Sequence, residues 1–443
     1  MKLKPELNIF QRFFRTEALS GFILLAAAVL ALIWANSAWA DVYNHIWELP
    51  LSIGSGNRTF TLTLHGWIND GLMAVFFLLV GVEIKRELVA GELSSPRKAA
   101  LPIAGAIGGM ILPALLYFML NAGGPGASGW GIPMATDIAF ALGALTLVAP
   151  NAPNSAKVFL AALAIVDDMG AVLVIALFYS SDIVMGMLGA AGVTLLVLIG
   201  LNLFRVTRLW PYLIVGVVLW YFVHESGVHA TIAAVALAMT IPTRTRINSA
   251  EFSAKARRLL DRFDEKDTGD HTILTSKGQQ DTLFALDNAR AAVAAPVLTL
   301  EQSLHRFSAF VVMPIFAFAN AGVQLGGQLK HREIAIGILA GLLVGKPLGI
   351  MAASWLAVKI RLAKLPIELS WRLLHGVAWL GGIGFTMSLF IGMLAFDDPL
   401  SIATAKKAIF GGSLVAGLIA AAVLHKASAS RRPGPPDSIP IDK

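Results

Sequence analysis

The sequence predicts an all-α integral membrane protein of about twelve transmembrane helices. Of its 443 residues, 56% are hydrophobic and only 14% are charged, whereas ordinary soluble domains carry about 25% charged residues. Apolar stretches of about 20 residues, long enough to cross a bilayer as helices, recur along the chain. Most charged residues lie in the segments between these stretches. The chain is therefore built for a bilayer.

The expected spans form two groups separated by one long polar segment. We expect helices one to eight within residues 19–247 and helices nine to twelve within residues 291–425. They start near Leu19, Leu64, Ala99, Gly131, Lys157, Ile183, Leu209, Val228, Phe307, Ile334, Leu369 and Thr404. The first stretch imitates a signal peptide, because a basic segment precedes it and SAWA (37–40) resembles a cleavage site. Its apolar run is long for a signal peptide and many spans follow, so we expect a retained helix.

Lysine and arginine alternate between the connecting segments and thereby predict orientation. The N-terminal segment 1–18, the loops around Arg86, Arg205 and Arg361, and the tail 426–443 are basic. The segments between them are poor in lysine and arginine, with GGQLKHRE (326–333) as the main exception. Because basic loops stay on the cytoplasmic side, both termini are expected there, which requires an even number of spans.

Residues 248–290 form the one long polar insertion. The segment is charged with mixed signs and contains the helical pattern EFSAKARRLLDRF (251–263), so we expect a cytoplasmic hairpin or a partly disordered linker. The tail 426–443 is rich in proline, which predicts disorder on the cytoplasmic side. The sequence has no cysteine, which excludes disulfides, thiolate catalysis and cysteine-based metal sites.

Four ionisable residues lie deep inside expected spans: Asp137, Asp167, Asp168 and Lys346. Each costs roughly 3 kcal/mol or more in a membrane, so each is a functional hypothesis, with structural ion pairing as the alternative. Adjacent residues on a helix point about 100° apart, so Asp167 and Asp168 cannot serve one purpose in one direction. One can face a water-filled site while the other meets Lys346 on a neighbouring helix.

Oxygen-bearing side chains supply the ligands that small hard cations prefer. The carboxylates of Asp168 and Asp137 and the hydroxyl of Thr136 carry that chemistry, which makes the two aspartates candidate ligands for Na⁺. A carboxylate pair can also store protons and titrates jointly. One small cation and protons would then compete for the same oxygens, and competition is a mechanism for exchange.

Two of the expected spans are interrupted. In GIPMATDIAFALG (131–143), Gly131 and Pro133 precede Thr136 and Asp137, so the helix is expected to open there. In WLGGIGFTMSLF (379–390) three glycines cluster: Gly381, Gly382 and Gly384. Interruptions in the middle of the third-to-fifth and tenth-to-twelfth spans predict two inverted-topology three-helix repeats with broken, crossing helices at a transport site. Tight helix packing is the alternative explanation for the glycines.

Motifs along the whole chain resemble those of NhaA-type sodium/proton antiporters of bacteria. The matching segments are FFLLVGVEIKREL (76–88), ATDIAFALGAL (135–145), LAIVDDMGA (163–171), SGVHATIA (226–233), FAFANAGV (316–323), GKPLGI (345–350) and GGIGFTMSLFI (381–391). The resemblance implies a multi-pass protein of the bacterial inner membrane that exports sodium or lithium for protons, electrogenically and by alternating access. Such a protein supports pH and sodium homeostasis. It is a transporter and not an enzyme, its ions are its substrates, and it needs no cofactor.

The resemblance also implies roles for the deep residues. Asp168 is expected to be the principal cation ligand, and Asp137 with Thr136 to line the crossing of the broken helices. Asp167 is expected to pair with Lys346. The proton carrier is left open among Asp167, Asp168 and Lys346.

A pH-sensing cluster is implied near the end of the second span and the start of the ninth. Its positions are Glu83, Arg86, Glu87 and Glu301, together with His229 and His305, which match positions associated with the pH response. Without the resemblance, a charged helix end and an interfacial histidine would explain these residues. The sequence departs from the family pattern here, because APVLTL (295–300) lacks basic residues and the polar insertion lies immediately upstream.

The family tends to form homodimers through a β-hairpin between the first two spans. Residues 59–64 alternate polar and apolar side chains and Gly56-Asn57 offers a turn, so a small periplasmic β-hairpin and a homodimer are compatible with the sequence.

Other functions fit less well. An intramembrane aspartyl protease would need its aspartates on facing helices, a prenyltransferase would need a DDxxD pattern, and Asp168 is followed by MGAVL. A channel needs rapid conduction, whereas adjacent aspartates and a buried lysine are better suited to binding and releasing an ion. A related sodium-coupled transporter of an organic anion is the closest alternative. No nucleic-acid partner is expected, because the basic residues do not gather in one patch with aromatics.

Overall fold

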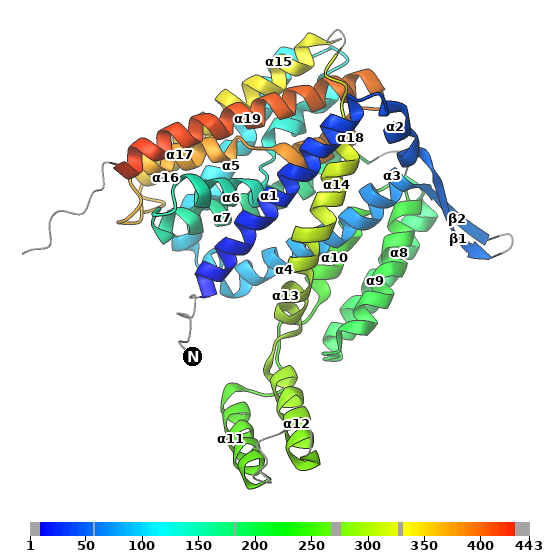
Figure 1. The fold of residues 1–443 in the computed structure, drawn as a ribbon, viewed down its shortest axis with the longest axis vertical. Helices are drawn as coiled ribbons and strands as arrows, with labels where there is room; N and C mark the ends of the chain where they lie inside the picture. The colour runs from blue at the N-terminus through cyan, green and yellow to red at the C-terminus, as the bar shows by residue number, and fades with distance from the viewer. Residues whose placement is uncertain (1–8, 56–57, 181–182, 267–275, 327–330, 430–443) are drawn as a thin grey trace, which may run out of the picture.

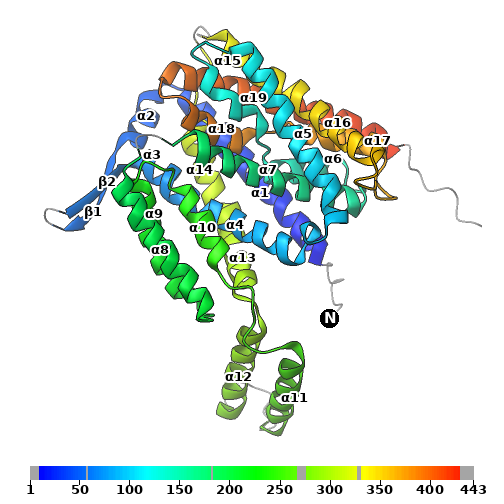
Figure 2. The ribbon, with the colours of Figure 1, turned by 180° about the vertical axis from the view of Figure 1, so that it is seen from behind.

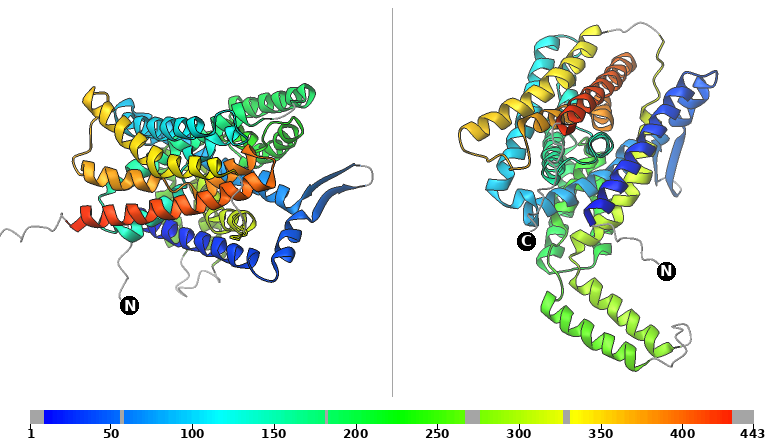
Figure 3. Two further views of the ribbon diagram at one scale, coloured as in Figure 1. Left: turned by 90° about the horizontal axis from the view of Figure 1, so that it is seen from above. Right: turned by 60° about the vertical axis from the view of Figure 1, so that its left-hand side comes forward.

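A computed structural model describes residues 9–55, 58–180, 183–266, 276–326 and 331–429. Almost all of this part is helical, and its one sheet is the antiparallel hairpin of β1 (Pro50–Ser55) and β2 (Arg58–Thr63). Figures 1 and 2 show one bundle, from which α11 (Ser249–Glu265) and α12 (Lys277–Val293) project at one end. The β-hairpin projects near the other end (Figure 3). We call these the α11–α12 end and the β-hairpin end.

The described helices include seven to ten candidate spans. Seven segments are long and apolar enough to cross a membrane, and three bent helix pairs raise the number to ten if each pair is one span. Two shorter apolar helices, α9 (Leu209–Glu225) and α10 (Thr231–Thr240), lie at further positions where the sequence predicts spans. The all-helical membrane fold and the small β-hairpin are thus confirmed, although the turn expected at Gly56-Asn57 lies outside the described residues.

The remaining helices divide at the polar insertion. Before it come α1 (Ile9–Ala35), α2 (Ala40–Glu48), α3 (Leu64–Gly66), η1 (Trp67–Leu72), α4 (Met73–Ala90), η2 (Glu92–Ser94), α5 (Pro96–Asn121), η3 (Ala127–Met134), α6 (Ile138–Val148), α7 (Asn154–Phe178) and α8 (Met185–Leu203). After it come α13 (Pro296–Phe307), η4 (Ser308–Val312), α14 (Met313–Asn320), α15 (Arg332–Ala340), η5 (Gly341–Gly345), α16 (Lys346–Lys359), α17 (Trp371–Gly381), α18 (Phe385–Ala395) and α19 (Pro399–Ala429).

Polar caps set where several helices begin outside the apolar core. Asn248 and Glu251 form a reciprocal capping box at the start of α11, with the Glu251 N–H 2.8 Å from Asn248 Oδ1. Asp398 accepts hydrogen bonds from the N–H and hydroxyl of Ser401, both at 2.9 Å, at the start of α19. These bonds hold the pKa of the exposed Asp398 carboxyl below its usual range, because they stabilise its charged form.

The polar insertion is a helical hairpin. Leu259 of α11 is buried and the Gln279 amide donates to the carbonyl of Phe263, so α11 and α12 pack against each other. The backbone N–H groups of Arg246 and Ile247 both donate to the carbonyl of Ala292, which joins the two ends of the insertion where they meet the bundle. The chain then bends by 102° between α12 and α13.

The chain ends differ from the expected boundaries. α1 begins at Ile9, and α19 continues to Ala429, past the boundary expected at residue 425. A helix can extend past its apolar stretch, because its backbone hydrogen bonds do not require apolar side chains. Residues 1–8 and 430–443 lie outside the described part, and the disorder expected for the tail falls mostly there.

Three long helices contain a π-helical turn: η1, η4 and η5. Such a turn adds one residue and rotates everything that follows, and it occurs often at functional sites. η5 ends directly before Lys346, so it sets the direction in which the first residue of α16 points.

Helices α5 and α16 pack backbone against backbone. A Cβ on Gly108 would lie 2.2 Å from the carbonyl oxygen of Gly349, and a Cβ on Gly349 would lie 2.1 Å from that of Gly108. Small residues permit such approaches between membrane helices. Cβ atoms added to Gly109 and Gly381 would lie 2.8 and 2.7 Å from side-chain atoms of Ile350 on α16, so these two glycines make room for Ile350. The glycines thus let α16 pack closely against its neighbours.

Replacing Gly108 with alanine should lower the thermal stability of the protein, because the new Cβ would overlap Gly349 and Ala353. Overpacking costs about 1–3 kcal/mol, which exceeds the roughly 1 kcal/mol gained by a Gly-to-Ala change inside a helix. Gly192→Ala on α8 is the matched control, because nothing lies within 4 Å of its added Cβ. Thermal unfolding in detergent checks this. Equal midpoints for Gly108→Ala and wild type would contradict the backbone contact.

Candidate functional site: two broken helices and their charges

The two interrupted spans meet inside the bundle. η3 ends at Met134 and α6 begins at Ile138, while α17 ends at Gly381 and α18 begins at Phe385 with a bend of 42°. The N–H of Asp137 donates to the carbonyl of Ile383 at 2.7 Å. The hydroxyl of Thr136 donates to the carbonyl of Gly381 at 2.9 Å. The first break therefore supplies hydrogen-bond donors to two backbone carbonyls at the second break.

The Asp137 carboxylate accepts hydrogen bonds from the first turns of two helices at this crossing. Its Oδ1 accepts from the N–H of Phe140 in the first turn of α6, at 3.0 Å. Its Oδ2 accepts from the hydroxyl of Thr386 at 2.5 Å and from the N–H of Thr386 at 3.2 Å, in the first turn of α18. A negative charge is favourable there, because helix N-termini carry partial positive charge. Asp137 is 1% exposed.

Thr386 is a site residue that the sequence reasoning missed. It lies two residues after Gly384, inside GFTMS (384–388). A hydroxyl in an apolar run just after a helix break is a signal that could have found it, because a threonine there can donate to a neighbouring carboxylate.

Lys346 joins α16 to α7 and to the first break. Its ammonium lies 2.5 Å from Oδ2 of Asp167, and both side chains are fully buried. It also donates to the carbonyl of Met134, the last residue of η3. The contact expected between Asp167 and Lys346 is present. The lysine additionally places positive charge against the carbonyl end of η3, where a cation is favoured.

Asp168 is buried, at 3% exposure, beside this pair. Within the described part of the chain, Oδ1 of Asp168 and Oδ1 of Asp167 have no hydrogen-bond partner. A buried carboxylate oxygen without a partner costs free energy. Such an oxygen is therefore ready to accept a cation or a proton.

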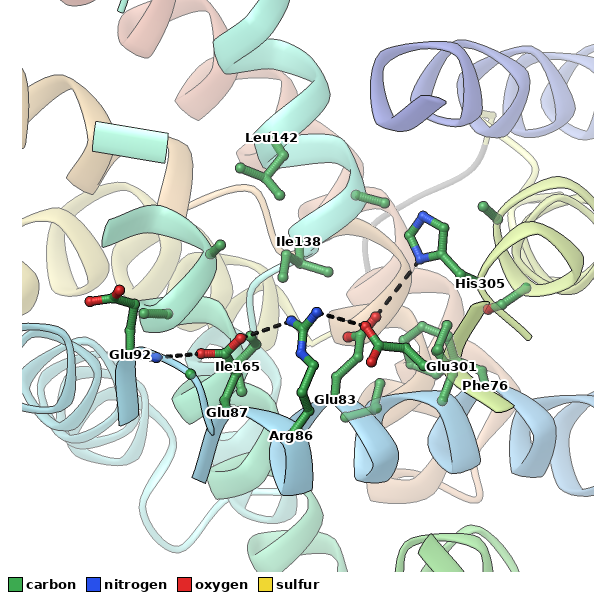
Figure 4. A pocket seen from close by; sticks show the side chains of 18 of the residues that line it. Phe76, Glu83, Arg86, Glu87, Glu92, Ile138, Leu142, Ile165, Glu301 and His305 are labelled. Carbon is green, nitrogen blue, oxygen red and sulfur yellow. Dashed lines mark hydrogen bonds and ion pairs between the residues drawn. The ribbon is translucent and has the colours of Figure 1, made fainter. Parts of the chain in front are cut away.

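A cavity of about 480 Å³ leads toward these carboxylates from the α11–α12 end. Its charged lining residues are Glu83, Arg86, Glu87, Glu92, Lys157, Glu301 and His305, and its apolar wall includes Phe76, Ile138, Leu142, Ile165 and Met313 (Figure 4). Ile165 precedes Asp168 by one turn of α7, so the cavity stops about one helical turn short of it. Lys157 and Glu92 are lining residues that the sequence reasoning did not select.

Five of the six residues expected to sense pH gather on this cavity. Arg86 bridges Glu87 and Glu301, with both N–O distances 2.8 Å. Nδ1 of His305 lies 3.8 Å from Oε1 of Glu83 (Figure 4). The cluster therefore links α4 to α13 through ion pairs.

His229, the sixth residue, lies elsewhere. Its Nε2 is 2.5 Å from the carbonyl of Tyr179, which directly follows the C-terminus of α7. The cavity is instead lined by the N-terminal half of α7, from Lys157 to Ile165. His229 is therefore separated from the ion-pair cluster by most of the length of α7.

These features define a class of protein. A multi-pass membrane bundle with two interlocked broken helices, buried carboxylates and a charged cavity is a secondary transporter for a small cation.

Comparison with known proteins identifies the family. The family described as Na⁺/H⁺ antiporter 1 matches residues 11–424. The Na⁺/H⁺ antiporter NhaA of Oleidesulfovibrio alaskensis is 48% identical over 92% of this chain and 91% of its own. That of Koribacter versatilis is 45% identical over 97% and 94%, and that of Wolinella succinogenes is 46% identical over 92% and 90%. The chain belongs to the Na⁺/H⁺ antiporter 1 family, and sodium and protons are its substrates.

Removing only the buried lysine, in Lys346→Met, should destabilise the protein by about 3–5 kcal/mol, because Asp167 is left buried without its cation. The double variant Asp167→Asn/Lys346→Met removes both charges and should recover most of that loss. Thermal unfolding midpoints in detergent compare the two. A double variant as unstable as the single one would show that the ion pair is not what Lys346 contributes.

Proposed function

We propose that Na⁺ and protons compete for the carboxylate of Asp168, and that alternating exposure of this site to the two membrane faces exchanges them. The supporting observation is its buried Oδ1, which lacks a hydrogen-bond partner in the described residues. The cavity approaches this site from the α11–α12 end. A cation at Asp168 and a proton at Asp168 each remove the same charge penalty, so each ion displaces the other.

The neighbouring residues divide the remaining work. Asp137 and Thr136 hold the helix crossing, and Asp137 contributes negative charge that attracts Na⁺ toward Asp168. Asp167 and Lys346 lie directly beside Asp168 and their protons titrate jointly, so either of them can carry a proton during the cycle. Exchange of more protons than sodium ions would make the transport electrogenic. Li⁺, a smaller hard cation, should use the same oxygens.

The distribution of charge supports an orientation. The basic loops and the α11–α12 hairpin lie on the cytoplasmic side in this proposal, with both termini, and the β-hairpin lies in the periplasm. The protein then sits in the bacterial inner membrane, exports Na⁺ and imports protons, and supports pH and sodium homeostasis.

The cluster on the cavity supports control of activity by pH. Protonation of Glu301 would weaken the ion pair that joins α4 to α13, because its bond to Arg86 requires a carboxylate. Glu301 lies on α13, which continues through η4 into α14. A change at Glu301 can therefore be passed along these helices to those around the site. His229 responds separately, at the far end of α7.

The β-hairpin supports a homodimer. Leu51 and Ile53 of β1 are 48% and 65% exposed, and the hairpin extends away from the bundle (Figure 3). Its unpaired strand edges and exposed apolar side chains offer a second copy an antiparallel partner.

Asp168→Asn should abolish sodium-driven proton movement, because an amide cannot carry the negative charge for which the two ions compete. Sodium is added to inverted vesicles that hold a preformed pH gradient, with no organic substrate present, and a pH-sensitive dye reports collapse of the gradient. Asp261→Asn on the exposed face of α11 is the matched control and should behave as wild type. Normal exchange by Asp168→Asn would refute the site.

Glu301→Gln should shift the pH range of exchange while leaving the maximal rate nearly unchanged, because it removes one ion-pair partner of Arg86 without touching Asp168. Exchange rates measured in the same vesicles across pH 5–9 test this, since carboxylate and histidine titrations fall within about that range when buried. An unchanged pH profile together with wild-type rates would remove Glu301 from the proposed sensor.

A further inference from the structure

A second pocket lies where the polar insertion joins the bundle. It measures about 200 Å³ and shares no lining residue with the cavity that leads toward Asp168. Its walls come from the chain just before the insertion, from the last turn of α12, and from the starts of α9 and α13. Figures 1 and 2 show this junction beneath α13. We call it the junction pocket.

Among the described residues, the junction pocket is lined by three arginines and by no carboxylate. The arginines are Arg244 and Arg246, which precede α11, and Arg290 in the last turn of α12. The backbone N–H of Arg246 donates to the carbonyl of Ala292 at 2.9 Å, which holds the two chain segments side by side. Positive charges from separate parts of the sequence are thereby brought to one small concavity.

Two of these guanidinium groups have no acidic partner in the described ranges. Arg290 donates from Nε to Oδ1 of Asp287 at 2.9 Å, with both side chains well exposed. Nε of Arg246 donates to the hydroxyl oxygen of Thr207 at 2.5 Å, and this neutral partner also lines the pocket. Arg244 has no hydrogen bond or ion pair with a described residue. Because a guanidinium carries five N–H groups, each arginine keeps donors for a ligand.

Two helices also begin at the junction pocket. Leu209 and Pro296, the first residues of α9 and α13, both line it. Neither helix has a side-chain cap, and neither has an acidic residue in its first turn. Helix N-termini carry partial positive charge and N–H groups that favour an anion. The helix ends therefore add to the positive field that the arginines create.

The chemistry of the junction pocket matches a phosphate group. Guanidinium groups bind phosphate oxygens through paired hydrogen bonds, and the hydroxyls of Thr207 and Thr299 add two neutral donors. A terminal phosphate carries about −1.5 to −2 charge at neutral pH, which balances the two arginines that lack an acidic partner. A phosphodiester carries less charge and leaves part of the field unbalanced. The pocket therefore favours a terminal phosphate.

We propose that the junction pocket binds a dianionic phosphate group, held by Arg244, Arg246 and Arg290, and that the bound group fastens the polar insertion to α9 and α13. The group belongs either to a soluble phosphate compound or to a lipid with a terminal phosphate headgroup, because both present the same chemistry to the pocket. The site is separate from Asp168 and from the ions that the protein exchanges.

The position of the junction pocket gives a bound phosphate a consequence for α13. Thr299 lies in the first turn of α13, two residues before Glu301, whose carboxylate pairs with Arg86 at 2.8 Å. A phosphate that bridges the insertion and this first turn restrains the helix that carries the ion pair. The polar insertion thereby gains a role as the part of the protein that completes an anion site.

Binding of inorganic phosphate to the purified full chain in neutral detergent tests the site. Radiolabelled potassium phosphate is measured by equilibrium dialysis at neutral pH without Na⁺, with chloride adjusted to keep the ionic strength constant. Arg244→Gln is the main variant, because this arginine makes no bond within the described residues that its loss could break. Arg257→Gln on the exposed face of α11 removes the same charge away from the pocket and is the matched control. Thermal unfolding midpoints without phosphate show that each variant folds.

We expect saturable binding of phosphate to wild type and to Arg257→Gln, and at least about tenfold weaker binding to Arg244→Gln, because charge-assisted hydrogen bonds are lost. Arg246→Lys keeps the charge but loses the planar fork, so its affinity should fall between the two. Phosphate should also raise the thermal midpoint of wild type more than that of Arg244→Gln, because a ligand stabilises the folded state that binds it.

Two lipids added in detergent distinguish the sources of the phosphate. Displacement of bound phosphate by phosphatidic acid, but not by phosphatidylglycerol, assigns the site to a lipid headgroup with a terminal phosphate. No displacement by either lipid assigns it to a soluble compound. Equal displacement by both lipids, displacement by phosphatidylglycerol alone, absence of saturable binding, or equal weakening in Arg244→Gln and Arg257→Gln would overturn the proposal.

Discussion

Helix ends that meet inside a membrane constrain the rest of this structure. The carbonyl end of η3 is served by the ammonium of Lys346, and the N-termini of α6 and α18 share the carboxylate of Asp137. Without water, an uncompensated helix end is costly. These charges are therefore strongly favoured at the crossing, and the contact of Gly108 with Gly349 packs α16, which begins with the lysine, directly against α5.

This compensation leaves one group for transport. Asp137 receives donors from both helix ends, and Asp167 is paired with Lys346 through Oδ2. Asp168 has a buried oxygen without a hydrogen bond and no ion-pair partner among the described residues. The cavity approaches it from one side. A site that is open to one face at a time, with one ion accepted at a time, is the physical requirement for coupled exchange.

Much of this arrangement could be predicted from residue type. Ionisable residues in apolar spans identified Asp137, Asp167, Asp168 and Lys346, because their burial is too costly to be incidental. Glycine and proline identified both breaks. Thr386 was missed because one hydroxyl among apolar residues is an ordinary local pattern. The buried hydrogen bonds of Asn320 with His65 and Asn69 were missed because these residues meet only after distant segments pack. The sequence alone could not show that His229 lies far from Glu301, because that separation along α7 depends on how the helices pack.

The central claim is that Na⁺ and protons compete for Asp168, and sodium binding to the purified protein tests it most directly. Titration with Na⁺ in weakly buffered detergent solution, at several pH values, gives both the affinity and the protons released. Competition predicts proton release on each binding event and an apparent sodium affinity that falls about tenfold for each pH unit below the titration of the carboxylates. Sodium binding that releases no protons, with an affinity independent of pH, would contradict the account.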